Sequence, residues 1–400
     1  MTLLRAIPLI LLLLAPTPLS AASDLPPARS AVTNCLAEPS RNCALAAALM
    51  VTADEELAIT RVDNLAAVAD ALAHLGDIER ARATVDLAIQ AARDIGLSVA
   101  TEQKLGEIVG ILAEVGEAPR AIEIAEGLTD RFRRANALGA IALAQARSGD
   151  VSGAQATLDR IGIPLLALKY AVDMSEEIAE SGQIDGPTAA ALERRLGTVD
   201  HRLLRALGYT RLAVLKARQG DVEGARRLRD IAAAERDYIL DNAERARYFA
   251  GLARAALALG ETDAYADAVA RARGLALRVN ADFDQTIAIS DVVAALAAGG
   301  RIDEAVALAG RVTDLRAQSR LVTRLAARRA AAAAVVPLAR HVLDSINEDQ
   351  SRFERDRARL AVARALAGVG AVPQAVEVIA AMENDDAQAQ ALAALAWNLD

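Results

Sequence analysis

Histidine and aromatic side chains are scarce in this chain, which limits the chemistry it can support. Its 400 residues include three histidines, and 2% of residues are aromatic. The histidines stand alone, outside any His-Glu-x-x-His zinc motif. The sequence also lacks a Gly-x-Ser-x-Gly nucleophile elbow and a Gly-x4-Gly-Lys phosphate loop. We therefore expect a protein that is not an enzyme and holds no cofactor or metal. The alternative is a hydrolase whose acidic residues converge from different parts of the fold.

Lysine is nearly absent as well, so arginine carries almost all of the positive charge. Lys104, Lys169 and Lys216 are the only lysines, and the formal net charge is -8. Proteins that bind nucleic acid present a basic face to the phosphates. An acidic chain of this kind is expected to have no nucleic-acid partner.

A long apolar run is missing, but a short one lies near the N-terminus. Arg5 precedes the apolar segment 7–15, and the small residues Ser20, Ala21 and Ala22 follow it. This order is typical of a secretory signal peptide (residues 1–22), with cleavage expected after Ala22. The segment is too short to span a bilayer about 30 Å thick. We therefore expect a periplasmic or secreted protein with no membrane insertion after cleavage; an uncleaved anchor is the alternative.

Cys35 and Cys43 are the only cysteines. In an exported protein, two cysteines without further Cys or His ligands nearby favour one structural disulfide over a metal site. A free or redox-active pair is the alternative. The bond would clip together two short helices, expected over residues 30–36 and 41–52. Residues 23–52 are thus predicted to form a lead-in and an N-terminal cap, which covers the open end of a repeat array.

What the sequence does contain is a repeated glycine with a regular environment. Aliphatic residues lie eight positions before and two positions after most of these glycines, so they form the buried stripes of two consecutive helices. Glycine closes a helix in the left-handed conformation, and Asp77, Asp150 and Asp221 directly after it are suited to cap the next helix. Six of the seven glycines have alanine five residues later, Gly260 being the exception: Gly76, Gly116, Gly149, Gly220, Gly260, Gly300 and Gly370.

This pattern predicts an all-α fold, a right-handed α-α superhelix of antiparallel helix hairpins. Units recur every 32 to 40 residues or so, and two have irregular turns, near Gly182 and Ala331. Residues 53–400 are predicted to form one solenoid with no linker inside it. A helix over residues 382–398 is expected to finish the array with a polar side exposed to solvent.

The repeat has a small residue before the turn, the glycine, an aliphatic residue two positions after it and alanines five and twelve positions after it, and in this it resembles a tetratricopeptide repeat. The segment LGAIALAQARSGD at residues 138–150 is particularly similar. The resemblance extends over residues 53–382. It departs from the family where bulky aromatics are replaced by Leu and Ala and where the closing proline is missing. It implies a superhelix whose concave face, lined by first helices, holds peptides or partner proteins.

The variable positions two and six residues before each glycine are expected to project into that groove. The expected groove residues at these positions are Asp70, His74, Glu114, Arg147, Arg218, Arg254 and Arg364. Three arginines among them, Arg147, Arg218 and Arg254, are suited to an acidic peptide or a C-terminal carboxylate. The alternative is a solvated charged face without a ligand.

Eight of the ten aromatic residues lie between Phe132 and Phe283, which makes this middle region the expected partner site. Tyr209 and Phe249 occupy stripe positions and are expected in the core, whereas Tyr248 is a further groove candidate. Tyr170, Tyr238 and Tyr265 are also expected to be open to solvent.

The expected function is therefore an exported, non-catalytic scaffold that binds a protein or peptide. A structural subunit of a cell-envelope assembly, joined through flat helix faces, is the main alternative. The sequence names neither the partner nor the oligomeric state.

Overall fold

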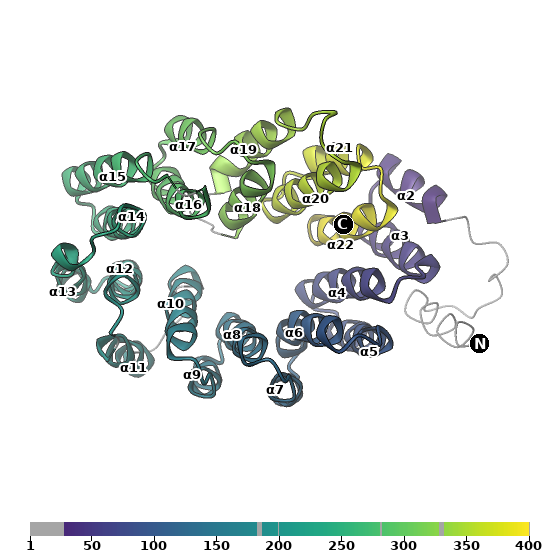
Figure 1. Cartoon of the computed structure of the whole chain (residues 1–400), viewed down its shortest axis with the longest axis horizontal. Helices are drawn as coiled ribbons and strands as arrows, with labels where there is room; N and C mark the ends of the chain where they lie inside the picture. The colour runs from purple at the N-terminus through teal and green to yellow at the C-terminus, as the bar shows by residue number, and fades with distance from the viewer. Residues whose placement is uncertain (1–27, 182–185, 199, 281, 328–331, 400) are drawn as a thin grey trace. The chain divides into compact units, whose positions relative to one another are not determined.

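The computed structural model describes residues 28–181, 186–198, 200–280, 282–327 and 332–399. All regular secondary structure in these ranges is helical, so the predicted all-α class with helices in adjacent antiparallel pairs is confirmed (Figure 1). The proposed signal peptide lies outside the described residues, as do Gly182 and the Ala331 turn. No helix of the described part is long and apolar enough to cross a membrane.

Most helices belong to hairpins that consist of a first and a second helix. The first helices are α4 (Ala58–His74), α6 (Ser98–Glu114), α8 (Arg131–Arg147), α10 (Pro164–Ser181), α12 (Arg202–Arg218), α14 (Asn242–Ala258), α16 (Asp282–Ala298), α18 (Leu315–Ala326), α20 (Arg352–Gly368) and α22 (Asp385–Leu395). The second helices are α5 (Ile78–Asp94), α7 (Ala118–Glu126), α9 (Val151–Asp159), α11 (Gly186–Gly197), α13 (Val222–Ala233), α15 (Thr262–Ala276), α17 (Ile302–Ala309), α19 (Ala332–Asp344) and α21 (Val372–Ala380). The remaining elements are α2 (Ala28–Ala37), α3 (Arg41–Asp54) and the 3-10 turns η1 (Arg236–Tyr238) and η3 (Ala396–Asn398).

The glycine turns have the conformation that the repeat pattern predicts. The seven repeated glycines of the sequence pattern, here called the marker glycines, all have positive φ, from 73° at Gly260 to 87° at Gly149. The side chains of Asp77, Asp150 and Asp221 accept hydrogen bonds from the first turns of α5, α9 and α13. Gly96, after α5, also has positive φ, and its place between two hairpins is why it fell outside the repeat pattern.

The chain divides into two compact units. Unit 1 contains residues up to 124 and from 343 onward, and unit 2 contains residues 125–342. The division falls inside α7 and α19, so no linker segment marks it. A boundary inside two helices has no linker composition by which it could be recognised in the sequence.

In unit 2 the first helices stack in chain order, from α8 through α10, α12, α14 and α16 to α18. Their contacts are close because small residues lie between them. A Cβ added to Gly251 of α14, for example, would lie 2.8 Å from the Thr210 hydroxyl oxygen of α12. The core is thus built from alanine and small aliphatic side chains, with Tyr209 and Phe249 buried in it as expected.

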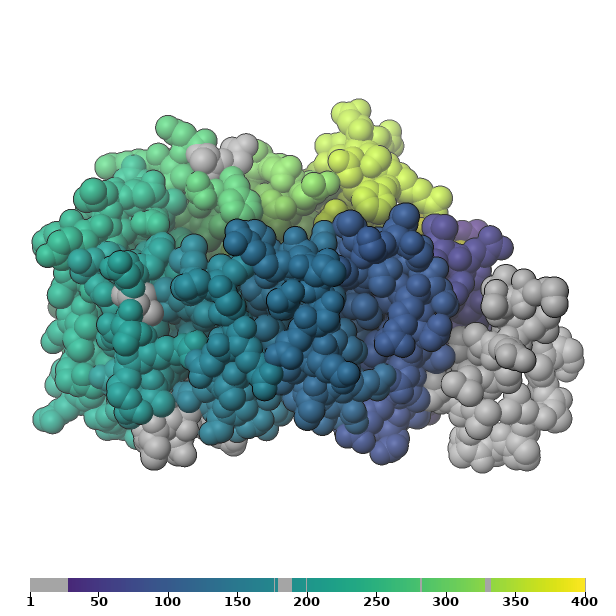
Figure 2. Space-filling view, turned by 60° about the horizontal axis from the view of Figure 1, so that its bottom comes forward, coloured from purple at the N-terminus to yellow at the C-terminus, as the bar shows by residue number. Residues whose placement is uncertain are grey.

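In unit 1 a hairpin forms between helices from distant parts of the sequence. Helix α22 packs against α3, and also against α4 and α20 (Figure 1). In Figure 2 the yellow surface of the C-terminal helices adjoins the purple surface of α2 and α3. Helix α3 therefore takes the place of the second helix that α22 lacks.

This packing corrects two expectations about the ends of the array. Helices α2 and α3 were expected to cover an open end, but α22 occupies the flank of α3. The helix over residues 382–398 was expected to expose a polar side, but no residue of α22 is exposed, and its polar residues are only partly accessible. Both expectations failed because they assumed that the two terminal helices have no neighbours beyond the next hairpin.

Polar side chains join the two segments. The Asn64 amide of α4 donates to Asp386 of α22 at 2.8 Å, and the Gln390 amide donates back to the Asn64 carbonyl oxygen at 3.0 Å. Arg29 of α2 pairs with Asp385 at 3.4 Å, near solvent. The predicted disulfide joins Cys35 of α2 to Cys43 of α3, with the two Cα atoms 5.5 Å apart.

Arginine recurs fifteen positions before several of the repeated glycines, near the start of a first helix. Arg61 and Arg134 donate to backbone carbonyls of the loop before their own helix, at Glu55 and Leu128. Arg205 pairs with Glu235 just after its own hairpin. The guanidinium groups thus satisfy loop carbonyls and nearby acids, which fixes the entry of the chain into each first helix.

Candidate functional site

The expected groove residues separate into two groups, one in each unit. Asp70, His74, Glu114 and Arg364 lie in unit 1, where α4, α6, α20 and α22 bring them near a single pocket. In unit 2, Arg254 lines a pocket of its own, whereas Arg147 and Arg218 do not line it. The two groups differ in charge and in size and are described in turn.

Both pockets use a longer stripe of the first helices than the sequence pattern suggested. The expected positions were six and two residues before the glycine. The pocket in unit 2 also uses positions thirteen and nine residues before it, where Arg247 and Arg211 lie. Positions that differ by seven lie on the same side of a helix, two turns apart. Extending the stripe by seven residues would therefore have found both arginines.

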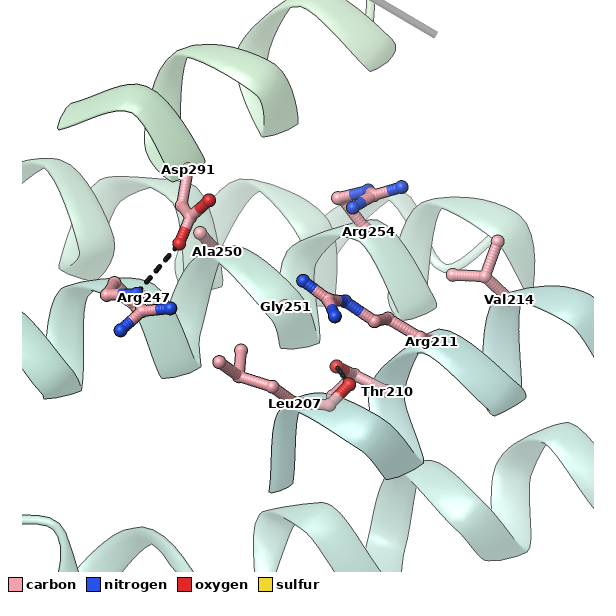
Figure 3. A pocket seen from close by; sticks show the side chains of 9 residues that line it. All are labelled: Leu207, Thr210, Arg211, Val214, Arg247, Ala250, Gly251, Arg254 and Asp291. Carbon is pink, nitrogen blue, oxygen red and sulfur yellow. Dashed lines mark hydrogen bonds and ion pairs between the residues drawn. The ribbon is translucent and has the colours of Figure 1, made fainter. Parts of the chain in front are cut away.

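The unit 2 pocket lies on α12 and α14 (Figure 3). Arg211 comes from α12, Arg247 and Arg254 come from α14, and Asp291 reaches in from α16. Nε of Arg247 is 2.9 Å from Oδ2 of Asp291. Nη1 of Arg211 is 3.4 Å from Oδ1 of Asp173 on α10.

Arginines supply most of the charged groups that line this pocket. Among the described lining residues are the three arginines and the carboxylate of Asp291, and Asp173 of α10 pairs with Arg211. The side chains of Arg211 and Asp291 are largely buried, at 13% and 12% exposure, so these charges are only partly screened by water. Guanidinium groups bind carboxylates through charge-assisted hydrogen bonds, so a carboxylate is a suitable ligand group for this pocket.

The pocket is shallow and small. Its volume of about 20 Å³ holds little more than one water-sized group. Leu207, Ala250, Gly251 and Val214 form the apolar part of its wall. A ligand here must lie across the surface of α12 and α14 and insert a single group, as a peptide with one carboxylate does.

The other predicted arginines are placed elsewhere. Arg147 ends α8 and lies 3.6 Å from Glu177 of α10, and Arg218 is exposed in the last turn of α12. Arg147 and Arg218 therefore do not join Arg254 at this pocket, because they lie two residues before their glycines, one full turn beyond the pocket's stripe.

The prediction that Tyr248 lies in the groove is wrong. Its side chain is 1% exposed, and its hydroxyl donates to the Ala233 carbonyl oxygen at 3.1 Å. Burial raises the pKa of Tyr248 to about 12. Tyr265 is also buried, with its hydroxyl bonded to the Ala295 carbonyl oxygen. Each phenol places its ring in the core and satisfies its polar end on a backbone carbonyl, which periodicity alone does not reveal.

The unit 1 pocket is larger, with a volume of about 440 Å³. It is built from four first helices and η3: α4 contributes Asp63 and Asp70, α20 contributes Arg364, α22 contributes Gln390, and η3 contributes Trp397. This volume falls within the range of small-ligand sites. The pocket exists because α22 lies beside α4.

Charges in this pocket are mixed and paired. Nζ of Lys104 is 2.6 Å from Asp63 and 2.8 Å from Glu107. Burial alone would lower the pKa of Lys104, but these hydrogen bonds raise it overall. Burial lowers the pKa of Arg364, and the charges of Asp70 and Asp63 act against that decrease. Arg364 also donates to the Gln390 side chain at 3.1 Å.

His74 lies at the edge of this pocket beside Trp397. The two rings are stacked, with centroids 4.0 Å apart and planes inclined by 9°. Ligand atoms of Asp70, His74 and Glu114 lie within 4.8 Å of one another. The sequence pattern predicts these three residues only as separate groove positions. Their meeting, and the stacking of His74 on Trp397, depend on how α4, α6 and η3 pack and have no local sequence signal.

Comparisons with known proteins show little about function. No protein-family model matches the sequence, and no curated protein matches it. The crystal structure of Ton1535 from Thermococcus onnurineus NA1 aligns with 80% of this chain and 98% of its own, at 17% identity and a TM-score of 0.24. A circular tandem repeat protein with novel repeat topology aligns with 88% of this chain and 75% of its own, at 15% identity and a TM-score of 0.19. Likenesses this weak carry no argument about ligand or activity.

Proposed function

We propose that the chain is an exported, non-catalytic scaffold of tetratricopeptide-like hairpins that binds a protein or peptide through the stripe on its first helices. The observation that carries this proposal is the arginine pocket of unit 2. Arg211, Arg247 and Arg254 lie together there, around a depression that admits one small group. The ligand group expected there is a C-terminal carboxylate or an acidic side chain of a peptide.

Export of this scaffold to the periplasm or the cell exterior rests on the signal-like residues before Ala22 and on the disulfide between Cys35 and Cys43. Disulfides persist in oxidising compartments, so a protein that relies on one is suited to function there. Mass spectrometry of the exported protein should find residue 23 at the N-terminus, and an intact Met1 would refute cleavage.

Binding can be tested with a library of labelled peptides that carry either a free or an amidated C-terminus. We expect acidic peptides with free carboxylates to bind the protein, and Arg254→Glu to weaken their binding by about tenfold or more, because a charge-assisted hydrogen bond contributes about 1.5–3 kcal/mol. Arg271→Glu on the outer helix α15, where the side chain is 51% exposed, is the matched control and should bind normally. Equal affinity of the Arg254 variant and wild type would remove the pocket from the proposal.

A structural subunit of an envelope assembly is the second candidate, and one observation favours it. Large apolar side chains are exposed near the start of several first helices, in both units: Leu57, Leu97, Phe132, Leu165, Leu240, Phe283 and Phe353. Helix ends of this kind are suited to a flat contact with another subunit. Substituting Phe132 and Phe283 by Ser would disrupt such an assembly but leave peptide binding at Arg254 intact, so the two candidates can be distinguished.

A further inference from the structure

Unit 1 contains a cluster of nitrogen and oxygen ligands that neither the fold nor the proposed scaffold function requires. Asp70 and His74 lie one turn apart on α4, and Glu114 ends the neighbouring helix α6. One ligand atom from each lies within 4.8 Å of the other two. We propose that these three side chains bind a divalent transition-metal ion of the zinc type.

The three side chains must move closer together to bind one ion. Zinc bonds to imidazole nitrogen and carboxylate oxygen are about 2.0–2.2 Å long, so a tetrahedral ion holds its ligand atoms roughly 3.3 Å apart. One ligand atom each of Asp70, His74 and Glu114 lies within 4.8 Å of the other two. All three residues are at least partly exposed, so rotation about their side-chain bonds can close this difference.

The imidazole is held in place by a contact outside the ligand set. Its ring stacks on Trp397 of η3, with a centroid distance of 4.0 Å. Nδ1 donates to the Asp70 carbonyl oxygen at 2.9 Å, which leaves Nε2 as the nitrogen that binds the ion. Metal-binding histidines are commonly oriented by such neighbouring groups, which limit the motion of the ring and so the cost of ordering it.

The ligand set selects the class of metal. Mg²⁺ and Ca²⁺ prefer six or more oxygen ligands, whereas imidazole together with carboxylates suits Zn²⁺, Co²⁺ and Ni²⁺. Three protein ligands leave a coordination position for water or another ligand. The pocket of about 440 Å³ lined by Asp70 and Trp397 provides space for it.

The existing interactions of Asp70 and Glu114 limit the affinity of the site for metal. The charge of Arg364 acts on Asp70, and both carboxylates of the cluster take part in other polar interactions. The two carboxylates must therefore give up some of these interactions when they bind the ion. We expect micromolar affinity for this reason, weaker than that of a closed structural zinc site.

The experiment uses the full exported chain without an affinity tag, titrated with ZnCl₂ and with CoCl₂. Trp397 is the single tryptophan of the sequence, so its fluorescence reports directly on the ring that His74 contacts. We expect one ion per chain by calorimetry, a fluorescence change that saturates at one equivalent, and visible absorption of bound Co²⁺ typical of fewer than six ligands.

Three variants test the ligands. Glu114→Gln and Asp70→Asn keep side-chain size, and His74→Phe keeps an aromatic ring against Trp397 but removes the nitrogen ligand. Each should weaken binding by at least about tenfold, because one of three protein ligands is lost. Glu79→Gln on α5, at a carboxylate that is 92% exposed, is the matched control and should bind normally.

Circular dichroism at the titration temperature verifies that each variant is folded. The proposal is overturned if wild type binds neither ion at millimolar concentration. It is also overturned if Mg²⁺ binds more tightly than Zn²⁺, or if folded Glu114→Gln and His74→Phe bind Zn²⁺ with unchanged affinity.

Discussion

Two hairpins of this molecule are built alike but joined differently. Helices α14 and α15 of unit 2 are consecutive and connected by a turn at Gly260, whereas α22 and α3 of unit 1 are more than three hundred residues apart. The first pair is held by its turn and its apolar stripe. The second has no turn and depends on the buried alanines and leucines of α22, while Asn64 with Asp386 joins α22 to α4 and the disulfide joins α3 to α2. Covalent connection is therefore not needed to form a hairpin in this fold, provided that its two apolar faces match.

The difference also determines the two pockets. The arginine pocket of unit 2 lies on consecutive hairpins and is small, and its residues follow one helical stripe. The pocket of unit 1 is larger, and Gln390 and Trp397 reach it only because α22 lies beside α4. Loss of α22 packing should therefore remove the unit 1 pocket and leave the arginine pocket intact.

The largest expected effect comes from the core of the hairpin that α3 and α22 form, which we call the split hairpin. Leu392 of α22 is fully buried, so Leu392→Ala should destabilise unit 1 by about 2–5 kcal/mol through lost burial and a remaining cavity. Hydrogen exchange should increase in α3 and α4 and stay unchanged in α14 and α15. Equal increases in both hairpins would mean that α22 does not act on unit 1 specifically.

The disulfide should have the next largest effect. Replacing Cys35 and Cys43 together by serine increases the conformational entropy of the unfolded chain around α2 and α3. We expect the free energy of unfolding to fall by about 2–3 kcal/mol. Urea unfolding of the double variant, compared with the oxidised wild type, measures this cost. Unchanged unfolding would show that packing against α22 alone holds α3.

The turn of the continuous hairpin provides a paired test. Gly260 has φ of 73°, so Gly260→Ala should destabilise unit 2 by about 1–2 kcal/mol. Gly274 lies inside α15 with open space around it, and Gly274→Ala should instead stabilise by about 0.5–1 kcal/mol. The split hairpin has no such glycine, so neither change should alter exchange in α3. Two effects of the same sign in unfolding experiments would contradict the role of the turn.

The smallest effect is a pH dependence confined to the split hairpin. The pKa of Asp386 is raised to about 6, chiefly by burial; the hydrogen bond from Asn64 acts against this increase and the nearby Glu55 carboxyl adds to it. An unfolded aspartate titrates near pH 4. The folded state therefore binds this proton more tightly, so the stabilisation is present at low pH and is lost as the pH rises through about 6.

Asp386→Asn should remove this dependence, because the amide oxygen still accepts from Asn64 but no longer titrates. Asp385→Asn, at the more exposed neighbouring carboxylate, is the control and should keep it. Thermal melts between pH 5 and 8 measure the difference. A wild-type unit 1 that becomes more stable as the pH rises from 5 to 7 would contradict the assignment.

Local features of the fold were predictable from the sequence, and non-local ones were not. The positive φ of the marker glycines and the caps at Asp77, Asp150 and Asp221 follow from residues within a few positions of each turn. Arg211 and Arg247 were missed although the same helical stripe contains them, because only its last two turns were considered. The pairing of α22 with α3 has no periodic signal, since each helix shows only that it has an apolar face.

The burial of Tyr248 illustrates the same limit. Its position next to the core residue Phe249 allows either orientation, and the carbonyl of Ala233 that accepts its hydroxyl is fixed by the end of α13. The Asp70, His74 and Glu114 cluster likewise needs two helices at a particular spacing. Side chains on separate hairpins can be assigned to one site only after the stacking of those hairpins is known.

The most direct test of the split hairpin is hydrogen exchange of α3 in the full chain and in a chain that lacks residues 384–400. Because α22 covers the flank of α3, its removal should increase exchange across residues 41–54 by at least about tenfold, while α14 and α15 exchange as before. Equal protection of α3 in the two chains would contradict the pairing of α3 with α22.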